Sequence, residues 1–264
     1  MPTARPHKSV TDLTVEFAET GSRLDQDQEW CLVTRDGLAE RVRFHDYARI
    51  YQIPGLYEKL FYERLACTSP PTVAGLLNDA LRAEGLDPAS LAVLDLGAGN
   101  GMVGEALKEI GAHTFVGVDV VREAREACQR DRPGLYRDYV VADFTDLPAA
   151  TAARIRSHGL NTLTTVAALG FGDIPAQAFR TAWNLIETPG WVAFNIKETF
   201  LDEKYQYGFA LLIRQLVDNG LLEVKTQQRY LHRLAMSGEP LHYIAIVGRK
   251  TGQIPDDWTV DEQG

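Results

Sequence analysis

The residues best suited to chemistry in this 264-residue chain lie in one glycine-rich turn. The turn reads Asp95-Leu96-Gly97-Ala98-Gly99-Asn100-Gly101-Met102 and follows a short apolar run that begins at Ala92. Alternating glycines let a backbone bend tightly and approach a ligand without interference from a Cβ atom. A helix that starts at Gly101 would add free backbone N–H groups at its N-terminus. The turn is therefore a candidate ligand cradle.

Two kinds of cofactor compete for this turn. Gly99-x-Gly101-x-x-Gly104 matches the dinucleotide fingerprint, and Asp119 lies 20 residues after Gly99, where the acid of an NAD site is expected. Asp95 favours a different ligand, because a carboxylate at the tip of the strand would face the pyrophosphate of a dinucleotide. The same carboxylate suits S-adenosylmethionine, which carries an ammonium group near a sulfonium and no phosphate.

Two further acids separate these interpretations. Asp119 ends the apolar run Phe115–Val118, and Asp143 ends the run Tyr139–Ala142. Ligands of parallel sheets collect at the carboxyl ends of the strands, which lie about 5 Å apart. We expect Asp95, Asp119 and Asp143 to line one crevice and to meet the methionyl ammonium, the ribose hydroxyls and the adenine amino group, respectively. Each acid alone also fits a helix cap or a turn, but the set of three favours S-adenosylmethionine.

The elements that must position these residues alternate along the chain from Leu91 onward. Short apolar runs between helical stretches are typical of a parallel sheet with crossover helices. We expect strands at 92–96, 114–118, 139–142, 162–168, 191–196, 222–229 and 241–247, and helices near 101–110, 122–130, 151–157, 176–186 and 207–219. Turn residues at 237–240 make the last two strands a hairpin. The predicted fold class is α/β, with a seven-stranded, mostly parallel sheet that ends in an antiparallel pair.

The segment before this core is expected to form a hairpin and a helical lid over residues 29–88. Arg35-Asp36-Gly37 is a turn signal between two apolar stretches. Aromatic and aliphatic residues at helical spacing follow over 45–67, where Pro54-Gly55 favours two short helices. A further amphipathic helix is expected over 72–84. Residues 1–28 are expected to be a flexible tail, residues 89–250 the cofactor-binding core and residues 251–264 a C-terminal tail.

Composition narrows the class of protein. The chain has 27 Lys and Arg against 36 Asp and Glu, a net charge of −9, which disfavours a nucleic-acid partner. Its three cysteines are widely spaced, which favours the reduced cytoplasm. No apolar run approaches the length needed to span a bilayer, so no membrane association is expected. The histidines show no paired spacing, so no metal site is predicted.

The sequence resembles class I S-adenosylmethionine-dependent methyltransferases, and among them the Williams–Beuren-region methyltransferase-like proteins, over roughly residues 45–248. The resemblance is carried by Asp95-x-Gly97-x-Gly99-x-Gly101, Gly117-Val118-Asp119, Ala142-Asp143-Phe144 and Thr188-Pro189-Gly190-Trp191. It implies a Rossmann-like fold, S-adenosylmethionine as methyl donor and S-adenosylhomocysteine as product. It also implies that Asp119 binds the ribose, and that Asp143, the Phe144 N–H group and the Val120 side chain surround the adenine. Val166 and Ala167 would lie near the methionyl end. The cofactor-binding residues expected are Asp95, Gly97, Ala98, Gly99, Asn100, Gly101, Met102, Asp119, Val120, Asp143, Phe144, Val166 and Ala167.

The acceptor side is less well marked. If the acceptor must lose a proton, the candidate bases are His45, Tyr47 and Glu198. The residues expected to face the acceptor are Tyr51, Tyr57, Leu169, Phe171 and Asn195. Purely structural interpretations also stay open. They are plain packing for the aromatic stripe Tyr47, Tyr51, Tyr57 and Phe61, a structural role for His45, and a solvated charge run around residues 197–205.

The function expected is methyl transfer to an O, N or C atom of a small-molecule acceptor. Three alternatives stay open: an NAD(P)-dependent oxidoreductase, a protein methyltransferase, and a non-catalytic protein on a methyltransferase scaffold. The sequence predicts no oligomeric state.

Overall fold

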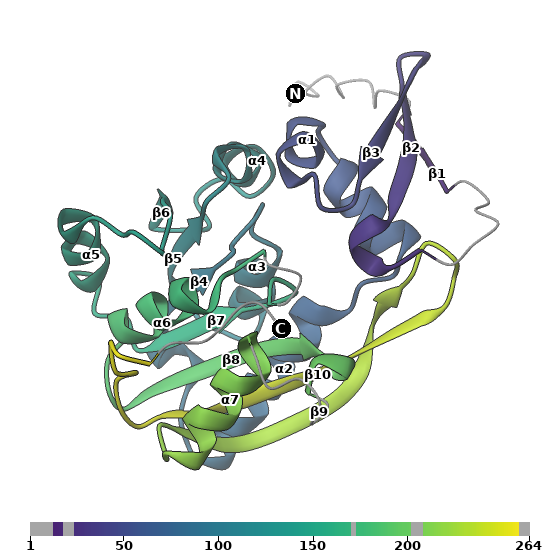
Figure 1. The fold of residues 1–264 in the computed structure, drawn as a ribbon. Helices are drawn as coiled ribbons and strands as arrows, with labels where there is room; N and C mark the ends of the chain where they lie inside the picture. The colour runs from purple at the N-terminus through teal and green to yellow at the C-terminus, as the bar shows by residue number, and fades with distance from the viewer. Residues whose placement is uncertain (1–12, 18–23, 170–172, 202–207, 259–264) are drawn as a thin grey trace, which may run out of the picture.

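The chain forms two sheets, one small and N-terminal and one large and central (Figure 1). The computed structural model describes residues 13–17, 24–169, 173–201 and 208–258. The small sheet has the order β1-β2-β3, and the large sheet has the order β6-β5-β4-β7-β8-β10-β9. The predicted fold class is confirmed, including the antiparallel pair at the end of the sheet.

The large sheet is parallel from β6 to β8 and antiparallel from β8 to β9. Its strands are β4 (Ala92–Leu96), β5 (Thr114–Asp119), β6 (Asp138–Val141), β7 (Thr162–Thr165), β8 (Gly190–Lys197), β9 (Leu222–Leu234) and β10 (Pro240–Lys250). β7 ends earlier than expected because Ala167 adopts a left-handed backbone with φ of 57°, which leaves the extended range of a strand. β9 and β10 are longer than expected and continue beyond the sheet toward the N-terminal segment (Figure 1).

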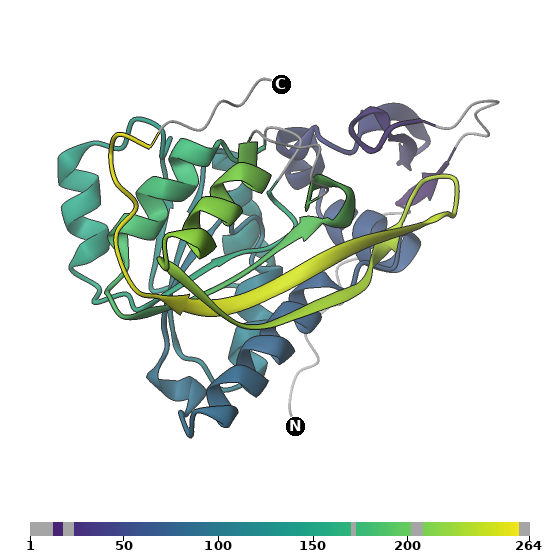
Figure 2. The same cartoon turned by 60° about the horizontal axis from the view of Figure 1, so that its bottom comes forward.

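Helices cover both faces of the large sheet. They are α2 (Ser69–Ala83), α3 (Met102–Glu109), α4 (Arg122–Asp131), α5 (Ala149–Arg156), α6 (Ala176–Leu185) and α7 (Gly208–Asp218). Figure 2 shows green helices on one side of the sheet and blue helices on the other. Alternation along β4 explains the two cores, since successive strand side chains point to opposite faces. Leu94 and Leu96 belong to the core that α6 and α7 complete, while Val93 packs in the core of α2 and α3.

The N-terminal segment folds into a small unit above the carboxyl ends of the strands. It contains β1 (Thr14–Glu16), β2 (Trp30–Arg35), β3 (Leu38–Arg43), α1 (Tyr47–Gln52) and a π-helical turn, η2 (Glu58–Arg64). Asp36 and Gly37 both have positive φ, as the tight turn of the predicted β2–β3 hairpin requires. The two short helices expected on either side of Pro54-Gly55 are confirmed, although the second is a π-helix.

The two tails are partly ordered, which corrects the sequence-based boundaries. β1 pairs with β2, and Val15 is buried in the N-terminal core. A three-residue strand carries too short a pattern to be recognised, and the edge of β2 supplies its hydrogen bonds. At the other end Ile254 is buried, and the Trp183 indole N–H donates to the Gly252 carbonyl. Residues up to 258 therefore extend the folded core.

β9 fastens the N-terminal segment to the core. The side chains of Arg233 and Glu29 form an ion pair at 2.7 Å and are 4% and 2% exposed. Nearby, the Leu234 N–H donates to the Leu65 carbonyl, and the Thr68 N–H donates to the His232 carbonyl. The lid thus has a defined position relative to the sheet. Within the described part of the chain, no helix is both long and apolar enough to traverse a lipid bilayer.

Candidate cofactor and acceptor site

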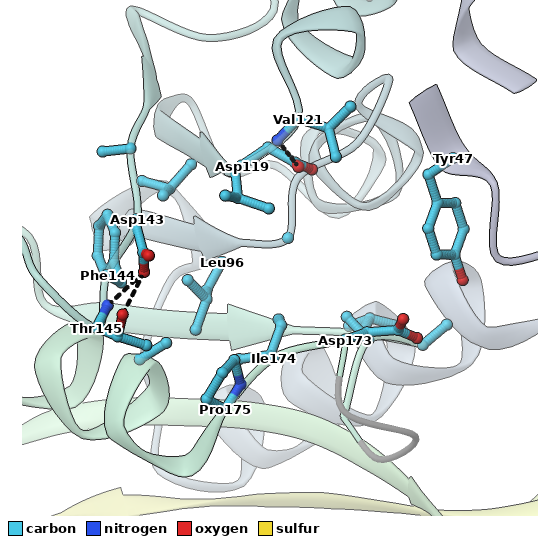
Figure 3. A pocket seen from close by; sticks show the side chains of 18 of the residues that line it. Tyr47, Leu96, Asp119, Val121, Asp143, Phe144, Thr145, Asp173, Ile174 and Pro175 are labelled. Atoms are coloured by element: carbon cyan, nitrogen blue, oxygen red, sulfur yellow. Dashed lines mark hydrogen bonds between the residues drawn. The ribbon is translucent and has the colours of Figure 1, made fainter. Parts of the chain in front are cut away.

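A cavity of about 520 Å³ lies where the carboxyl ends of β4, β5, β6 and β7 meet the lid. Its volume falls in the range of cavities that hold cofactors and small ligands. Figure 3 shows Asp119 and Asp143 on one side of it and Tyr47 and Asp173 on the other. The lining residues are Tyr47, Tyr51, Tyr57, Leu96, Gly97, Val118, Asp119, Val120, Val121, Ala142, Asp143, Phe144, Thr145, Val166, Ala167, Ala168, Asp173, Ile174, Pro175 and Ala178.

Asp119 is the last residue of β5 and lines this cavity. Its carboxylate accepts hydrogen bonds from the backbone N–H groups of Gly99 and Val121, both at 2.9 Å. Burial raises the pKa of Asp119, and these hydrogen bonds oppose the rise because they stabilise the charged form. A carboxylate has about four acceptor positions, so two backbone donors leave capacity for a pair of ligand hydroxyls.

Asp143 follows β6 and has the opposite environment. It is solvent-exposed, and the Thr145 hydroxyl and backbone N–H donate to it at 2.7 and 2.8 Å. These bonds hold the pKa of Asp143 below its usual value. Beside it Phe144 is 3% exposed, while Val120 is 63% exposed at the cavity mouth. An acceptor carboxylate next to two apolar side chains matches the needs of a planar ring that bears an amino group.

Asp95 does not line the cavity, which corrects its predicted role as a direct ligand for an ammonium group. It is 1% exposed and accepts hydrogen bonds from the hydroxyls of Tyr136 at 2.6 Å and Thr164 at 2.8 Å. Burial raises its pKa to about 6. The reason lies in the strand alternation, because the side chain of Leu96 faces the cavity and that of its neighbour Asp95 points to the other side of β4.

Only part of the glycine turn lines the cavity. Gly97 lines the cavity, and a Cβ atom there would lie 3.1 Å from both Ala168 and Ile174. Gly99 has a φ of 54°, and a Cβ atom on it would collide with the Tyr51 hydroxyl. The predicted cofactor residues that do not line the cavity are Asp95, Ala98, Gly99, Asn100, Gly101 and Met102. Those that line it are Gly97, Asp119, Val120, Asp143, Phe144, Val166 and Ala167.

The side chains of Asn100 and Met102 in the turn make contacts that lead to the lid and do not line the cavity. The Asn100 amide donates to Glu58 at 2.7 Å, and Arg132 pairs with the same carboxylate at 2.9 Å. The Arg132 guanidinium also lies 2.5 Å from the Met102 sulfur. The turn therefore connects the β4 strand end to the π-helical turn of the lid.

The tyrosines of the aromatic stripe pack against one another in the lid and also line the cavity. Tyr47, Tyr51 and Tyr57 form a stacked series, with ring centroids 6.3 and 5.1 Å apart, and all three contribute to the cavity wall. Tyr51 is only 5% exposed. The packing and lid interpretations of the stripe are thus compatible, since one ring face packs in the lid and another part of the side chain borders the cavity.

His45 lies at the edge of a second, smaller chamber of about 40 Å³ behind Tyr47. Its Nδ1 atom is 3.2 Å from Asp173 Oδ1. Asp173 was not among the predicted residues, although Leu169 and Phe171 nearby in the sequence were expected to face the acceptor. Leu169 also lines this chamber. The predicted acceptor residue Phe171 lies outside the described residues.

Two predicted acceptor-side residues lie elsewhere. Asn195 is completely buried: its side-chain oxygen accepts from the Ala167 N–H at 2.6 Å, and its amide donates to Tyr230 and Ser69. It shapes the cavity wall from behind and does not face an acceptor. Glu198 pairs with Arg229 at 2.7 Å on the surface and lines neither chamber. The structure thus places its carboxylate against a cation of the neighbouring β9 strand and outside both chambers.

Comparison with known proteins supports the same assignment of the fold. The family described as a methyltransferase domain matches residues 93–168, which run from β4 to the end of the cavity wall after β7. No curated protein matches the sequence.

Solved structures with this architecture include the N-methyltransferase NodS from Bradyrhizobium japonicum, determined with S-adenosylhomocysteine. It is 14% identical, with a TM-score of 0.52 over 79% of this chain and 98% of NodS. Magnesium protoporphyrin IX methyltransferase from Synechocystis, determined with S-adenosylmethionine, is 12% identical, with a TM-score of 0.45 over 69% of this chain and 79% of that one. A Thermoplasma acidophilum protein is 15% identical, with a TM-score of 0.47 over 76% and 97%.

The NodS likeness and the arrangement of β4 to β7 agree with the fold that the glycine turn and the strand-end acids predicted. Residues 93–168 thus match a methyltransferase-domain family, and the chain shares the Rossmann-like fold of the methyltransferase NodS.

Proposed function

We propose that this protein binds S-adenosylmethionine in the 520 Å³ cavity and transfers its methyl group to a small-molecule acceptor. The observation that carries the proposal is the position of Asp119, a carboxylate fixed by two backbone N–H groups on the wall of a cavity at the strand ends. The methyltransferase-domain match over the same strands supports it.

The cavity walls suggest how the cofactor lies. Asp119 binds the ribose hydroxyls, and Asp143 with Val120 and Phe144 surrounds the adenine. The methionyl part then lies along Gly97, Val166 and Ala167, on the side of the cavity that faces the lid. Asp95 does not contact the cofactor in this arrangement. Its effect is indirect, because it helps to set the position of β4. When bound, S-adenosylmethionine supplies a methyl group on a sulfonium that needs little further activation.

The backbone of the glycine turn favours this cofactor over a dinucleotide. A pyrophosphate is bound by free N–H groups of such a turn. Here the N–H groups of Gly97 and Ala98 donate to the Val118 carbonyl, that of Gly101 to Ala98, and that of Gly99 to Asp119. Four of the turn's donors are therefore used inside the protein. This pattern disfavours the oxidoreductase alternative, because these four donors are not free to bind a phosphate.

The contribution of the protein to the reaction is mainly one of position. The three stacked tyrosines of the lid close one side of the cavity and exclude water from it. Holding the acceptor in line with the methyl group and the sulfur lowers the activation free energy of reactions of this kind by roughly 7 kcal/mol or more. His45, held by Asp173, is the group best placed to take a proton from the acceptor. Tyr47 lies beside it and borders both chambers.

We assign a small acceptor because the lid covers the cavity on the side where the methyl group would lie. A protein acceptor would need an open groove there. The acidic balance of the chain adds to this assignment, since nucleic-acid partners are bound by basic surfaces. The three cysteines are free thiols, in keeping with a cytoplasmic site of action.

The proposal is tested by calorimetric titration of S-adenosylhomocysteine into the Asp119→Ala variant. Two ribose hydroxyls lose a charged acceptor, so the affinity should fall about 10- to 100-fold. Asp138→Ala is the matched control, because Asp138 begins the neighbouring strand β6 and pairs with Arg154 far from the cavity.

A second variant keeps the result interpretable if Asp119→Ala is unstable. Asp143→Ala changes an exposed residue and should weaken binding about tenfold, the effect of one good hydrogen bond to a charged group. Unchanged affinity in both variants, with the control equal to wild type, would refute the proposed site.

A further inference from the structure

The β9 strand is irregular where it passes the small chamber. Arg233 lies opposite Leu241 of β10, whereas the next residue of β10, His242, lies opposite Leu231. His232 therefore has no partner in register and forms a β-bulge. In a regular strand two consecutive side chains point to opposite faces, but here His232 and Arg233 are both buried and both line the chamber. Bulges are common beside active sites, where they redirect a side chain.

A buried hydrogen-bond network behind the chamber contacts His232. The Asn195 oxygen accepts from the Ala167 N–H at 2.6 Å, so the other end of this side chain is the amide donor. The amide donates to the hydroxyls of Tyr230 at 2.6 Å and Ser69 at 3.2 Å. The Tyr230 O–H in turn has the Ser69 oxygen, 2.7 Å away, as its acceptor among the described residues.

This network determines which ring nitrogen of His232 carries the hydrogen. The Ser69 oxygen accepts from Asn195 and Tyr230, which uses both of its lone pairs. Its own hydrogen is therefore donated to His232 Nδ1, which is 2.6 Å away. Burial lowers the pKa of His232 well below its usual value, so the ring stays neutral and has one N–H group. We assign that hydrogen to Nε2.

The Nε2–H group of His232 is available to a ligand. The hydrogen bonds that His232 forms with described residues are made by Nδ1 and leave Nε2 unpaired. Nε2 is also absent from the unpaired polar atoms that the described protein encloses completely. Since His232 lines the chamber and is 4% exposed, this donor opens into the chamber.

Arg233 adds a second donor to the same wall. Its Nη1 atom donates to the Leu234 carbonyl at 2.8 Å, and its Nη2 atom donates to Glu29 at 2.7 Å. The Nε–H group bonds to no described residue and, like that of His232, is not among the enclosed unpaired atoms. Two N–H groups match the two lone pairs of one carbonyl oxygen.

The charges around the chamber favour a neutral ligand over a carboxylate. Arg233 is neutralised by Glu29 in a buried ion pair, and the ring of His232 is uncharged. The carboxylate of Asp173 lines the chamber as well and would repel an anion. A ligand oxygen that accepts hydrogen bonds without carrying a charge satisfies these conditions.

The chamber is an extension of the main cavity. It has a volume of about 40 Å³ and shares five lining residues with the 520 Å³ cavity, namely Tyr47, Tyr57, Ala167, Ala168 and Asp173. Ala167 is also the residue along which the methionyl part of the cofactor is placed under the proposed function. A molecule anchored in the chamber would thus extend toward the methyl donor.

We propose that the small chamber binds a carbonyl group of an uncharged methyl acceptor, and that the Nε2–H of His232 holds its oxygen. The proposal rests on the proposed function and deepens it by naming the class of acceptor. A water molecule needs roughly 10–15 Å³ of such space, so the chamber holds a group of about three heavy atoms. It takes the carbonyl and one attached atom, while the rest of the acceptor, with the atom that is methylated, lies in the main cavity. His232 is a positioning and specificity residue and exchanges no proton.

Fluorine NMR of three probes tests the class of ligand without turnover. The probes are para-fluoroacetophenone, para-fluoroethylbenzene and para-fluorobenzoate, each titrated into the protein saturated with S-adenosylhomocysteine. The ketone and the hydrocarbon have similar shapes and differ by one carbonyl oxygen. We expect the ketone to bind about tenfold more tightly than the hydrocarbon, the effect of one buried hydrogen bond, and more tightly than the benzoate. Equal binding of ketone and hydrocarbon would overturn the proposal, and so would tightest binding of the benzoate.

Long-range proton–nitrogen NMR of the histidine rings measures the tautomer directly. We expect His232 to carry its hydrogen on Nε2 in the free protein. Its Nε2 resonance should shift when para-fluoroacetophenone is added and stay unchanged with para-fluoroethylbenzene. The resonance is identified by its loss in His232→Phe. A hydrogen on Nδ1, or an Nε2 resonance that does not respond to the ketone, would refute the role of His232.

Two variants locate the binding. His232→Phe keeps a ring against Tyr243, which lies 4.0 Å from the imidazole between ring centroids, and removes the donor. It should lower the affinity for the ketone about tenfold and leave that for the hydrocarbon unchanged. His158→Phe is the matched control, since His158 is 18% exposed, pairs with Asp138 and lines neither chamber.

Ser69→Ala keeps the imidazole if His232→Phe proves unstable. It removes the hydrogen that Ser69 donates to Nδ1, so part of the His232 population should move its own hydrogen to Nδ1, and the ketone should bind more weakly than to the wild type. Ketone affinity unchanged in both variants would refute the carbonyl site while S-adenosylhomocysteine still binds. Failure of S-adenosylhomocysteine to bind the wild-type protein would refute the proposed function itself.

Discussion

Replacing Gly99 by alanine tests whether the lid really closes on the glycine turn. Gly99 has a φ of 54°, and a Cβ atom there would meet the Tyr51 hydroxyl. Gly134 has a φ of 75° with no atom within 4 Å of the added Cβ. Both substitutions carry the cost of a left-handed alanine, about 1–2 kcal/mol. Only Gly99→Ala adds a steric conflict, which costs typically about 1–3 kcal/mol in a packed interior.

The expected loss of unfolding free energy is thus about 1–2 kcal/mol for Gly134→Ala and about 2–5 kcal/mol for Gly99→Ala. Tyr51→Phe removes the atom that the new methyl group would hit, because the next ring atom lies 3.4 Å away at ordinary contact distance. In a double-mutant cycle the Gly99→Ala, Tyr51→Phe protein should recover most of the extra loss.

Urea denaturation of the wild-type protein and the four variants, without ligand, measures these differences. The lid also has to be in place for the effect to appear, since Tyr51 belongs to α1 and Gly99 to the turn that follows β4. Equal losses for Gly99→Ala and Gly134→Ala would show that the hydroxyl does not lie over the turn. The same conclusion would follow if Tyr51→Phe recovered nothing.

Three other residues give separate predictions. Burial raises the pKa of Asp95 from 3.8 to about 6; its ionised form therefore opposes folding, and the stability that this group provides is present below about pH 4 and lost as the pH rises to about 6. Asp95→Asn should remove that decline, worth up to ~3 kcal/mol, when melting is followed against pH; parallel curves for the two proteins would contradict it. Asn195→Leu should cost about 2–4 kcal/mol, because it leaves the Ala167 N–H unpaired in the interior and removes two hydrogen bonds to the Ser69 and Tyr230 hydroxyls; a loss below about 0.5 kcal/mol, as at a neutral surface site, would mean that the network forms otherwise. Glu29→Ala breaks a buried pair with Arg233 and should cost about 3–5 kcal/mol, whereas Glu126→Ala, in an exposed pair, should cost about 0.5 kcal/mol or less; similar values in chemical denaturation would refute the buried geometry.

The succession of strands and helices along the chain could be predicted from the sequence because its signals are local. Short apolar runs give the strands, turn residues give the final hairpin, and the glycine turn marks the first crossover. The cavity acids Asp119 and Asp143 followed from one rule, that ligands collect at the strand ends. Both lie on the cavity wall.

Asp95 shows that the rule about strand ends must be combined with the alternation of side chains along a strand. It sits between Leu94 and Leu96, which both face the core of α6 and α7. Period-two alternation therefore points Asp95 to the opposite face. The same reasoning applies to Asn195, since a polar residue in a strand buried on both faces must be paired inside the protein. The sequence contained these signals, but position at a strand end outweighed them.

The acceptor side depends on contacts between distant parts of the chain. His45 and Asp173 are separated by 128 residues, and Gln26 and Tyr243 by 217. No periodicity or local motif reports such pairs. They arise because β9 and β10 extend past the sheet and carry the N-terminal segment with them. Only the three-dimensional arrangement could therefore identify the small chamber and the residues around it.

The most direct test of the central claim is calorimetric titration of the wild-type protein with S-adenosylmethionine, S-adenosylhomocysteine, NADH and NADPH. The geometry predicts micromolar binding of the first two compounds at one site per chain, and no heat from either nucleotide. Binding of a nicotinamide cofactor without S-adenosylhomocysteine would contradict the assignment of the cavity and restore the oxidoreductase interpretation of the glycine turn.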